Sequence, residues 1–133
     1  MDYKNSYDRY WKRFIWSFIF AWSGLKNAFR HEQNIRIHFT IGLVIIVLSF
    51  LLNIPLFEKI ILLLVIGVII SLEVMNTAIE RVVDLVTKEY HPLARIAKDV
   101  SAGAVLIFSM FAVIIGILIF YKPVVELISN YIW

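Results

Sequence analysis

Four polar residues near the middle of the sequence share one face of a predicted helix and could do chemistry together. They are Glu73, Asn76, Glu80 and Asp84. At about 100° per residue, the four fall within roughly an 80° arc, and we name them the polar stripe. Residues 60–72, which precede them, contain no charge and are rich in Leu, Ile and Val. A carboxylate beside such a run usually faces a bundle interior or a wet cavity, so we predict a functional site here.

Carboxylates and an amide at one membrane edge suit a site for a metal ion and a phosphate. Mg²⁺ prefers oxygen ligands, typically one or two carboxylates together with phosphates and waters. Phosphoryl transfer needs positioning, neutralisation of the phosphate oxygens and a base for the nucleophile's proton. The sequence has neither a Walker A loop nor the signatures of protein kinases, and its three His residues are scattered. The alternative interpretation is a solvated cytoplasmic extension of the helix, in which Asn76 and Glu80 simply lie in water.

The composition is typical of a membrane protein. Hydrophobic residues make up 61% of the 133 residues and the mean hydropathy is +0.82, far above an ordinary soluble domain. This length fits one small domain, residues 1–133. The absence of cysteine excludes disulfides and thiolate metal sites. The net charge of +3 does not indicate a nucleic-acid partner, because the basic residues are placed as in membrane proteins.

The spacing of apolar residues predicts an all-α membrane protein with four helices. Residues 10–31 carry Trp and Phe on one side and basic residues over much of the remainder, which predicts an amphipathic surface helix at the membrane–water interface. Packing of this helix on a soluble core is the alternative. Three apolar runs predict transmembrane helices at residues 37–55, 57–85 and 93–121. The second extends into the cytoplasm with the polar stripe, and Lys122 and Pro123 should stop the third.

The distribution of basic residues predicts the orientation in the membrane. Residues 1–36 hold seven Lys or Arg and residues 81–98 hold four, whereas Lys59 and Lys122 stand alone in the other two connecting regions. By the positive-inside rule, both basic segments are cytoplasmic, and the amino terminus lies inside. Four polar residues then lie on the cytoplasmic side, where nucleotide is available: Glu32, Glu80, Lys98 and Asp99.

The sequence from Glu73 to Asp84, followed by Ala97-Lys98-Asp99, resembles the signature of the prokaryotic integral-membrane diacylglycerol kinases and their undecaprenol kinase relatives. The resemblance includes Trp22-Ser-Gly-Leu25 and Glu32, and it extends from about residue 13 to the third span. It implies an ATP-dependent, Mg²⁺-dependent kinase of a membrane lipid alcohol in a bacterial cell membrane. It also implies a homotrimeric helical bundle of three spans and a surface helix per chain, with active sites shared between neighbours.

The resemblance implies roles for individual residues. Glu73 matches the catalytic base, Asn76 lies between base and metal, and Glu32 and Glu80 match the metal-binding carboxylates. The implied nucleotide contacts are Arg13, Phe20, Glu32, Glu80, Glu89, Tyr90, His91, Lys98 and Asp99. Phe20 stands where the diacylglycerol branch often has an aromatic residue with a hydroxyl, so that hydrogen bond to nucleotide is absent here. Glu73 and Ala102 are the implied lipid contacts.

The lipid substrate is predicted from the run His91 to Val105, which is similar to the undecaprenol kinase branch of Gram-positive bacteria in Pro92 and in Ala102-Gly103-Ala104. It implies undecaprenol, with diacylglycerol as the alternative. Diacylglycerol has ester carbonyls that need donors below Glu73, and the residues there on the same helix face are isoleucines: Ile66, Ile69 and Ile70. A small oligomeric proton-coupled transporter with Glu73 as its relay is a further alternative, although it would not require the cytoplasmic polar residues.

Overall fold

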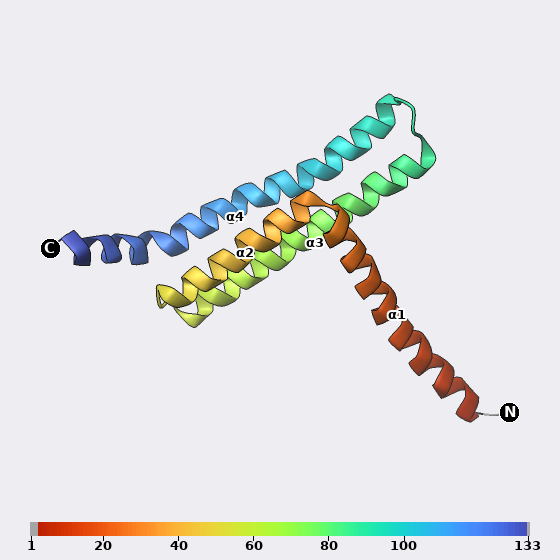
Figure 1. Cartoon of the computed structure of the whole chain (residues 1–133), viewed down its shortest axis with the longest axis horizontal. Helices are drawn as coiled ribbons and strands as arrows, with labels where there is room; N and C mark the ends of the chain where they lie inside the picture. Colours follow the sequence, from red (N-terminus) through yellow and green to blue (C-terminus); the bar gives the residue numbers. More distant parts are fainter. Residues whose placement is uncertain (1–2, 133) are drawn as a thin grey trace. The chain divides into compact units, whose positions relative to one another are not determined.

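Four α-helices make up the part of the chain that the computed structural model describes, residues 3–132, and no strand occurs within it. They are α1 (Tyr3–His31), α2 (Gln33–Leu51), α3 (Leu56–Val86) and α4 (Pro92–Ile132) (Figure 1). Side chains are described for residues 10–129. The chain divides into two compact units, Met1–Gln33 and Asn34–Trp133. The prediction of an all-α fold is confirmed.

Helix α1 makes up the first unit. Aromatic side chains pair along it; the ring centroids of Phe14 and Phe18, for example, lie 4.9 Å apart in an edge-to-face arrangement. Such pairs at i and i+4 stabilise a helix. The helix begins at Tyr3 rather than at the predicted residue 10, because residues 3–9 contain no Gly or Pro that would interrupt it. Its location on a membrane surface stays a prediction.

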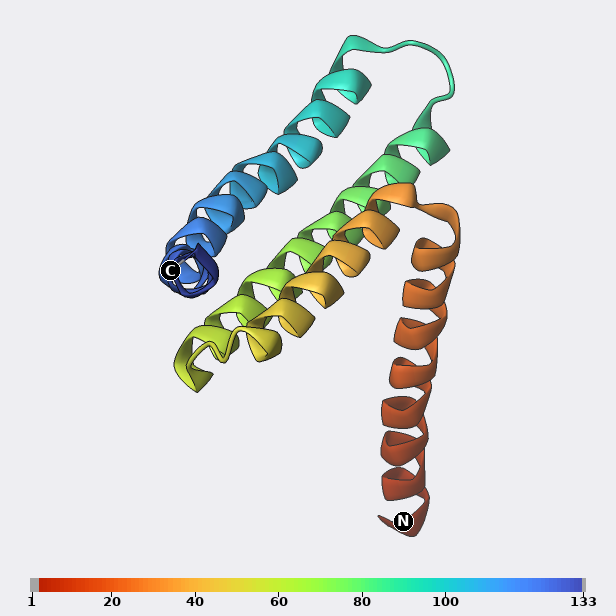
Figure 2. The ribbon, with the colours of Figure 1, turned by 60° about the vertical axis from the view of Figure 1, so that its left-hand side comes forward.

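The three helices of the second unit run antiparallel to their neighbours in the chain. Helix α4 returns along α3 and contacts it, and α2 runs antiparallel to α3, which follows it after residues 52–55 (Figure 1 and Figure 2). Helix α2 approaches α3 closely at Gly42, where an added Cβ atom would lie 2.7 Å from Cγ2 of Ile66. A glycine at this position therefore sets the spacing between the two helices, as small residues commonly do in membrane bundles.

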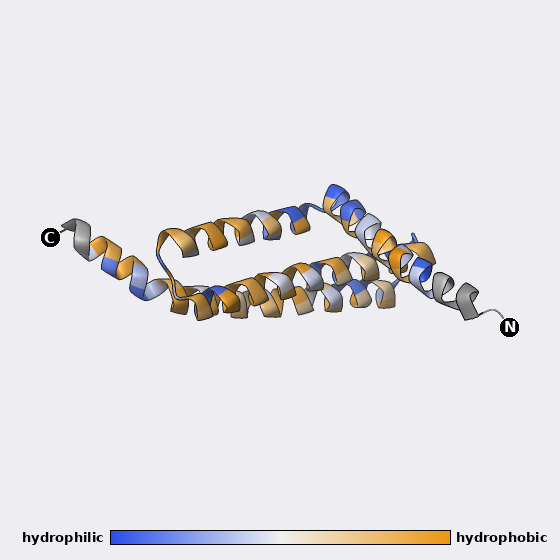
Figure 3. Ribbon diagram, turned by 90° about the horizontal axis from the view of Figure 1, so that it is seen from below, coloured by the Kyte–Doolittle hydropathy of each residue, from blue (hydrophilic) through white to orange (hydrophobic). Residues whose placement is uncertain are grey.

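Helices α2, α3 and α4 are each long and apolar enough to cross a membrane, over Gln33–Leu51, Leu56–Val86 and Pro92–Ser129. Figure 3 shows hydrophobic residues along most of their length. The share of residues buried inside the chain is small in these spans, from 6% in α4 to 28% in α3. Most of their apolar surface must therefore be covered by lipid or by other chains.

A tight turn joins α2 to α3. The backbone N–H of Ile54 donates to the carbonyl of Ser49 (3.0 Å), and that of Asn53 donates to the carbonyl of Phe50 (3.1 Å). Asn53 has a φ of 51°, a left-handed conformation that Asn tolerates. These features define a Schellman motif, which ends α2. Across the turn, the ammonium of Lys59 lies 4.2 Å from the centre of the Phe50 ring, a cation–π contact.

Helix α4 continues through Pro123 to Ile132, so the predicted stop at Lys122 and Pro123 is wrong. Proline removes one backbone hydrogen bond and bends a helix, but it ends one only if the following residues favour another conformation. Residues 124–128 are Val-Val-Glu-Leu-Ile and contain no turn signal. An ion pair between Lys122 and Glu126 (4.0 Å) also spans the turn that contains the proline.

Candidate functional site

The polar stripe changes gradually from buried to exposed along α3. Glu73 and Asn76 are buried, with 3% and 7% of their surface exposed, whereas Glu80 is half-buried and Asp84 is exposed. Asn76 lies on the side of α3 that packs against α4. The interpretation that Asn76 simply lies in water is therefore wrong, because this amide is enclosed between two helices.

Hydrogen bonds join the stripe to α4. The amide of Asn76 donates from Nδ2 to Oε1 of Glu80 (3.1 Å), and its Oδ1 accepts from the hydroxyl of Ser101 on α4 (2.5 Å). The Ser101 oxygen also lies 2.9 Å from the carbonyl oxygen of Lys98. Ser101 was not among the site residues that the sequence predicted. Its position two residues after Asp99, as the first hydroxyl in a run of small residues, was the available signal.

Glu73 stands apart from this chain of hydrogen bonds. Its carboxylate makes no hydrogen bond or ion pair to other residues in the part of the chain that the structure describes, although the residue is only 3% exposed. A carboxylate with few polar neighbours keeps its lone pairs free for a donor that enters the site. Glu73 is therefore available to accept a hydrogen bond, and then a proton, from a group that enters the site.

A polar cleft of about 260 Å³ lies where α3, the connecting segment and α4 meet. Five of its lining residues are predicted nucleotide contacts: Glu89, Tyr90, His91, Lys98 and Asp99. The connecting segment is held by Thr87, whose hydroxyl oxygen accepts from the backbone N–H of Glu89 (3.2 Å). Pro92, which opens α4, suits the first turn of a helix because it needs no backbone N–H there.

Two ion pairs lie in this polar cleft. The ammonium of Lys98 contacts Oδ1 of Asp84 at 2.6 Å, and Nε of Arg95 lies 3.5 Å from Oδ2 of Asp99. The first pair links α4 to α3, whereas the second is an i, i+4 pair within α4. Both pairs are solvated, so each is expected to contribute about 1 kcal/mol or less. A strong anion such as a phosphate can therefore replace either acid at the basic residue.

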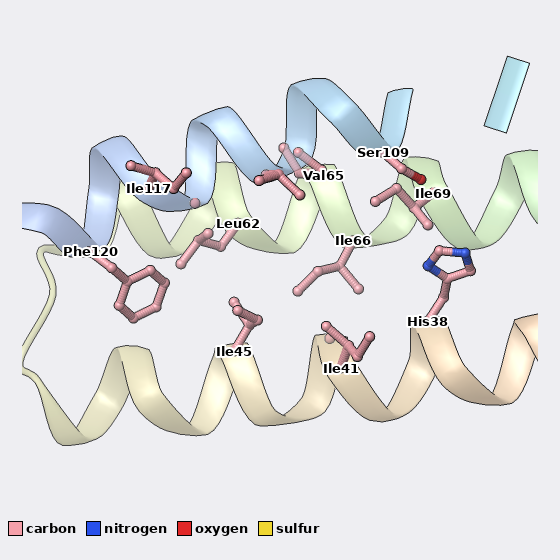
Figure 4. A pocket seen from close by; sticks show the side chains of 14 residues that line it. His38, Ile41, Ile45, Leu62, Val65, Ile66, Ile69, Ser109, Ile117 and Phe120 are labelled. Carbon is pink, nitrogen blue, oxygen red and sulfur yellow. The ribbon is translucent and has the colours of Figure 1, made fainter. Parts of the chain in front are cut away.

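An apolar cavity of about 510 Å³ lies between α2, α3 and α4. Figure 4 shows its two ends: His38, Ile69 and Ser109 surround one, and Ile117 and Phe120 surround the other. The remaining lining side chains are almost all aliphatic. Ile69 precedes Glu73 by about one helical turn, so along α3 the polar end of the cavity lies directly before the stripe.

Three further predicted site residues, Arg13, Phe20 and Glu32, belong to the first compact unit. Arg13 and Phe20 belong to α1, where the Phe20 ring stacks on Trp16 at 5.7 Å, and Glu32 follows α1. Their contacts with nucleotide or metal stay predictions, as does the lipid contact of Ala102, an exposed residue beside Ser101. Within the described residues, no group of three or more His, Cys, Asp or Glu side chains is placed to hold a metal ion.

Comparison with known proteins identifies the class of protein that carries this site. The family model described as prokaryotic diacylglycerol kinase matches residues 19–120. Undecaprenol kinase of Bacillus subtilis is 41% identical over 119 residues, which cover 90% of this chain and 94% of that protein. Diacylglycerol kinase of Synechocystis is 42% identical over 84% of this chain and 64% of its own length. Diacylglycerol kinase of Escherichia coli K12 is 34% identical over 71% of this chain and 78% of its own.

The chain therefore belongs to the prokaryotic diacylglycerol kinase family. The matched region contains the whole polar stripe, Ser101 and the residues of the polar cleft. The resemblance seen in the sequence is confirmed by these matches. The protein is a lipid kinase of a bacterial membrane, with three helices long enough to span it.

Proposed function

We propose that the protein transfers the γ-phosphoryl group of ATP to the hydroxyl of undecaprenol, with Glu73 as general base. The observation that carries this proposal is the order of features along α3. The apolar cavity reaches Ile69, the buried Glu73 follows about one turn later, and the polar cleft begins at Val83. A lipid chain in the cavity and a nucleotide in the cleft would approach this carboxylate from opposite sides.

The chemistry follows from that placement. Glu73 accepts the proton of the lipid hydroxyl as the hydroxyl oxygen attacks the γ-phosphorus, and the bond from that phosphorus to the β–γ bridging oxygen breaks to release ADP. A general base of this kind contributes about 10²- to 10⁴-fold to the rate. Lys98 would exchange Asp84 for phosphate oxygens as the nucleotide binds, since an ammonium recognises phosphate as a point charge.

The residues at hand suit Mg²⁺. Glu80 offers a half-buried carboxylate whose Oε1 is oriented by the Asn76 amide, and its remaining lone pairs are available to a cation. We assign Glu80 and Glu32 as the carboxylates that would hold the ion, because Mg²⁺ is commonly bound by one or two carboxylates plus substrate phosphates. The bound ion would neutralise charge on the phosphate oxygens.

Undecaprenol is proposed as the substrate because the similarity to the Bacillus subtilis enzyme covers 94% of that protein. The number of hydrogen-bond donors in the cavity does not discriminate between undecaprenol and diacylglycerol. Two polar side chains, His38 and Ser109, line the cavity together with the isoleucines of α3 and could donate to ester carbonyls. Diacylglycerol is the second candidate, because relatives that are 42% and 34% identical are named for it. Proton-coupled transport has no support once the kinase family is established.

The expected assembly is a homotrimer with the amino terminus and the active site cytoplasmic and α1 on the membrane surface. The number of three chains rests on the family resemblance alone. The orientation is supported by the eleven of thirteen Lys and Arg that lie in residues 1–36 or 81–98, and an assembly of more than one chain is supported by the small share of the spans that is buried within one chain. Mixing chains that carry Glu73→Gln with chains that carry Glu80→Ala tests shared sites. Recovery of activity in the mixture supports them, and complete inactivity places both residues in a site built by one chain.

Side-by-side kinetics tests the proposed reaction. The purified protein receives labelled ATP, Mg²⁺ and either undecaprenol or diacylglycerol in matched mixed micelles, with Glu73→Gln as the inactive control. We expect label in undecaprenyl phosphate and a clearly higher kcat/KM for undecaprenol. A higher kcat/KM for diacylglycerol would change the substrate and leave the site intact. Label in neither lipid would contradict the proposed reaction.

A further inference from the structure

We propose that Ser101 is a positioning residue of this enzyme. Its hydroxyl sets the orientation of the Asn76 amide, and that amide in turn holds the Glu80 carboxylate in position for the metal–nucleotide complex. The second half of this inference rests on the proposed function, in which Glu80 is a metal ligand. The first half depends only on the packing of α4 against α3.

The contacts form a continuous chain across the two helices. The hydroxyl of Ser101 lies 2.5 Å from Oδ1 of Asn76, and Nδ2 of Asn76 lies 3.1 Å from Oε1 of Glu80. Ser101 and Asn76 are buried, with 9% and 7% of their surface exposed. Water therefore has little access to replace either partner, and the amide depends on the two protein groups for its orientation.

The direction of each bond follows from what the groups can donate. An ionised carboxylate only accepts hydrogen bonds, so the amide must present its NH₂ group to Glu80. Its oxygen then faces α4 and requires a donor there. Ser101 supplies that donor, whereas alanine would leave a buried amide oxygen unpaired and allow the amide to turn over. Only this orientation of the Asn76 amide gives Ser101, Asn76 and Glu80 compatible hydrogen-bond partners.

The Ser101 hydroxyl has a second acceptor within reach, the carbonyl oxygen of Lys98 at 2.9 Å. One hydroxyl has one proton, so it donates to one oxygen at a time, and the shorter contact is the one to Asn76. Ser101 follows Lys98 and Asp99 within one turn of α4. The same hydroxyl thus fixes the distance between the helix that carries the metal carboxylate and the helix that carries the cleft residues.

Metal binding in the full-length oligomer tests the inference. Mn²⁺ affinity is measured by electron paramagnetic resonance with a non-hydrolysable ATP analogue present. Removing the partner of a metal ligand typically weakens metal affinity by about 10- to 100-fold, so we expect about a 10-fold loss for Ser101→Ala. Ser101→Thr, which keeps the hydroxyl, should restore most of the affinity. Ser71→Ala is the matched control, because the Ser71 hydroxyl donates only within α3, to the carbonyl of Gly67 (2.8 Å).

A second measurement reads the amide itself. In protein labelled with ¹⁵N at asparagine, the side-chain NH₂ resonances of Asn76, assigned with Asn76→Asp, should shift in Ser101→Ala and exchange faster with water. They should stay unchanged in Ser71→Ala. Unchanged Asn76 resonances in Ser101→Ala would overturn the inference. It would also be overturned if the resonances shift in Ser101→Ala but Mn²⁺ affinity does not fall, although Glu80→Ala lowers that affinity.

The two proposals fail in different ways. If Glu80→Ala binds Mn²⁺ as well as the parent protein does, the assignment of Glu80 as a metal ligand is wrong, and the Asn76 resonances still decide whether Ser101 orients the amide. In the Asn76→Ala background, Ser101→Ala should cause no further loss of Mn²⁺ affinity, because the two residues act in series. If Ser101→Ala lowers Mn²⁺ affinity by the same factor with and without Asn76→Ala, the inference is overturned. Thermal unfolding and oligomer size identify any variant that has simply misfolded.

Discussion

The two halves of the α3–α4 pair are held together in different ways. Near the connecting segment, directed polar bonds cross between the helices, from Ser101 to Asn76 and from Lys98 to Asp84. Farther along, the same two helices and α2 together line a cavity with almost entirely aliphatic walls. Directed bonds fix the position of each donor and acceptor, whereas aliphatic walls fix only a shape. The difference matches the two proposed substrates, a phosphate recognised by polar contacts and a hydrocarbon chain recognised by fit.

Removal of the proposed base, Glu73, should lower activity the most. It also distinguishes the residue that takes part in turnover from the residues that bind metal and nucleotide. We expect Glu73→Gln to lower kcat by about 10²-fold or more, because a general base is lost, while ATP and metal binding stay nearly intact. Glu80→Ala and Glu32→Ala should instead weaken metal and nucleotide binding. Steady-state kinetics together with equilibrium binding of an ATP analogue provide the measurement. Equal loss of ATP binding in all three variants would contradict this division of roles.

A methyl group at Gly42 tests the packing of the apolar half. The added Cβ of Gly42→Ala would lie 2.7 Å from the stiff, β-branched side chain of Ile66, so α2 and α3 must separate. Overpacking of this kind destabilises by about 1–3 kcal/mol, and we expect thermal inactivation in detergent at a lower temperature. Gly67→Ala is the control, since beyond its neighbours and the backbone of its own helical turns, no atom of the described chain lies within 4 Å of its added Cβ. Equal stability of the two variants would show that α2 can shift freely.

Neutralising Asp84 should give the smallest effect. Lys98 lies 2.6 Å from Asp84 in a solvated pair, so Asp84→Asn removes a competitor for the ammonium and a negative charge near the phosphates. A pair of this kind is worth about 0.2–1 kcal/mol, and we expect the KM for ATP to fall by about 1.4- to fivefold. Folding stability should change little. A rise in KM in an ATP titration would show that Asp84 instead holds Lys98 in place for the nucleotide.

Local sequence patterns predicted the helices and the stripe because both depend on residues close together in the chain. Apolar runs fix where helices can span a membrane, and the spacing from Glu73 to Asp84 fixes a common face whatever packs against it. The helices and the stripe required no knowledge of how distant segments pack. The family resemblance, rather than a local pattern, indicated Glu89, Tyr90, His91 and Lys98, and the structure brings these residues to one cleft.

Features that depend on the register between helices could not be predicted from local sequence patterns. The bond from Ser101 to Asn76 joins residues 25 positions apart, and a shift of one residue in α4 would turn Ser101 away. The cavity also needs His38 from α2 and Ser109 from α4 at the same depth, which no single helix specifies. Pro123 shows a different limit: a proline weakens a helix locally, and the residues after it decide whether the helix ends.

The Schellman turn between α2 and α3 has a consequence for biogenesis. Only residues 52–55 connect the two helices, so they must enter the bilayer together as a hairpin. On the proposed topology, the turn is the part translocated to the outer face. The charges that travel with it, on Glu58 and Lys59, cancel, and the Lys59 ammonium lies 4.2 Å from the centre of the Phe50 ring. The hairpin thus presents no net charge to the translocation step.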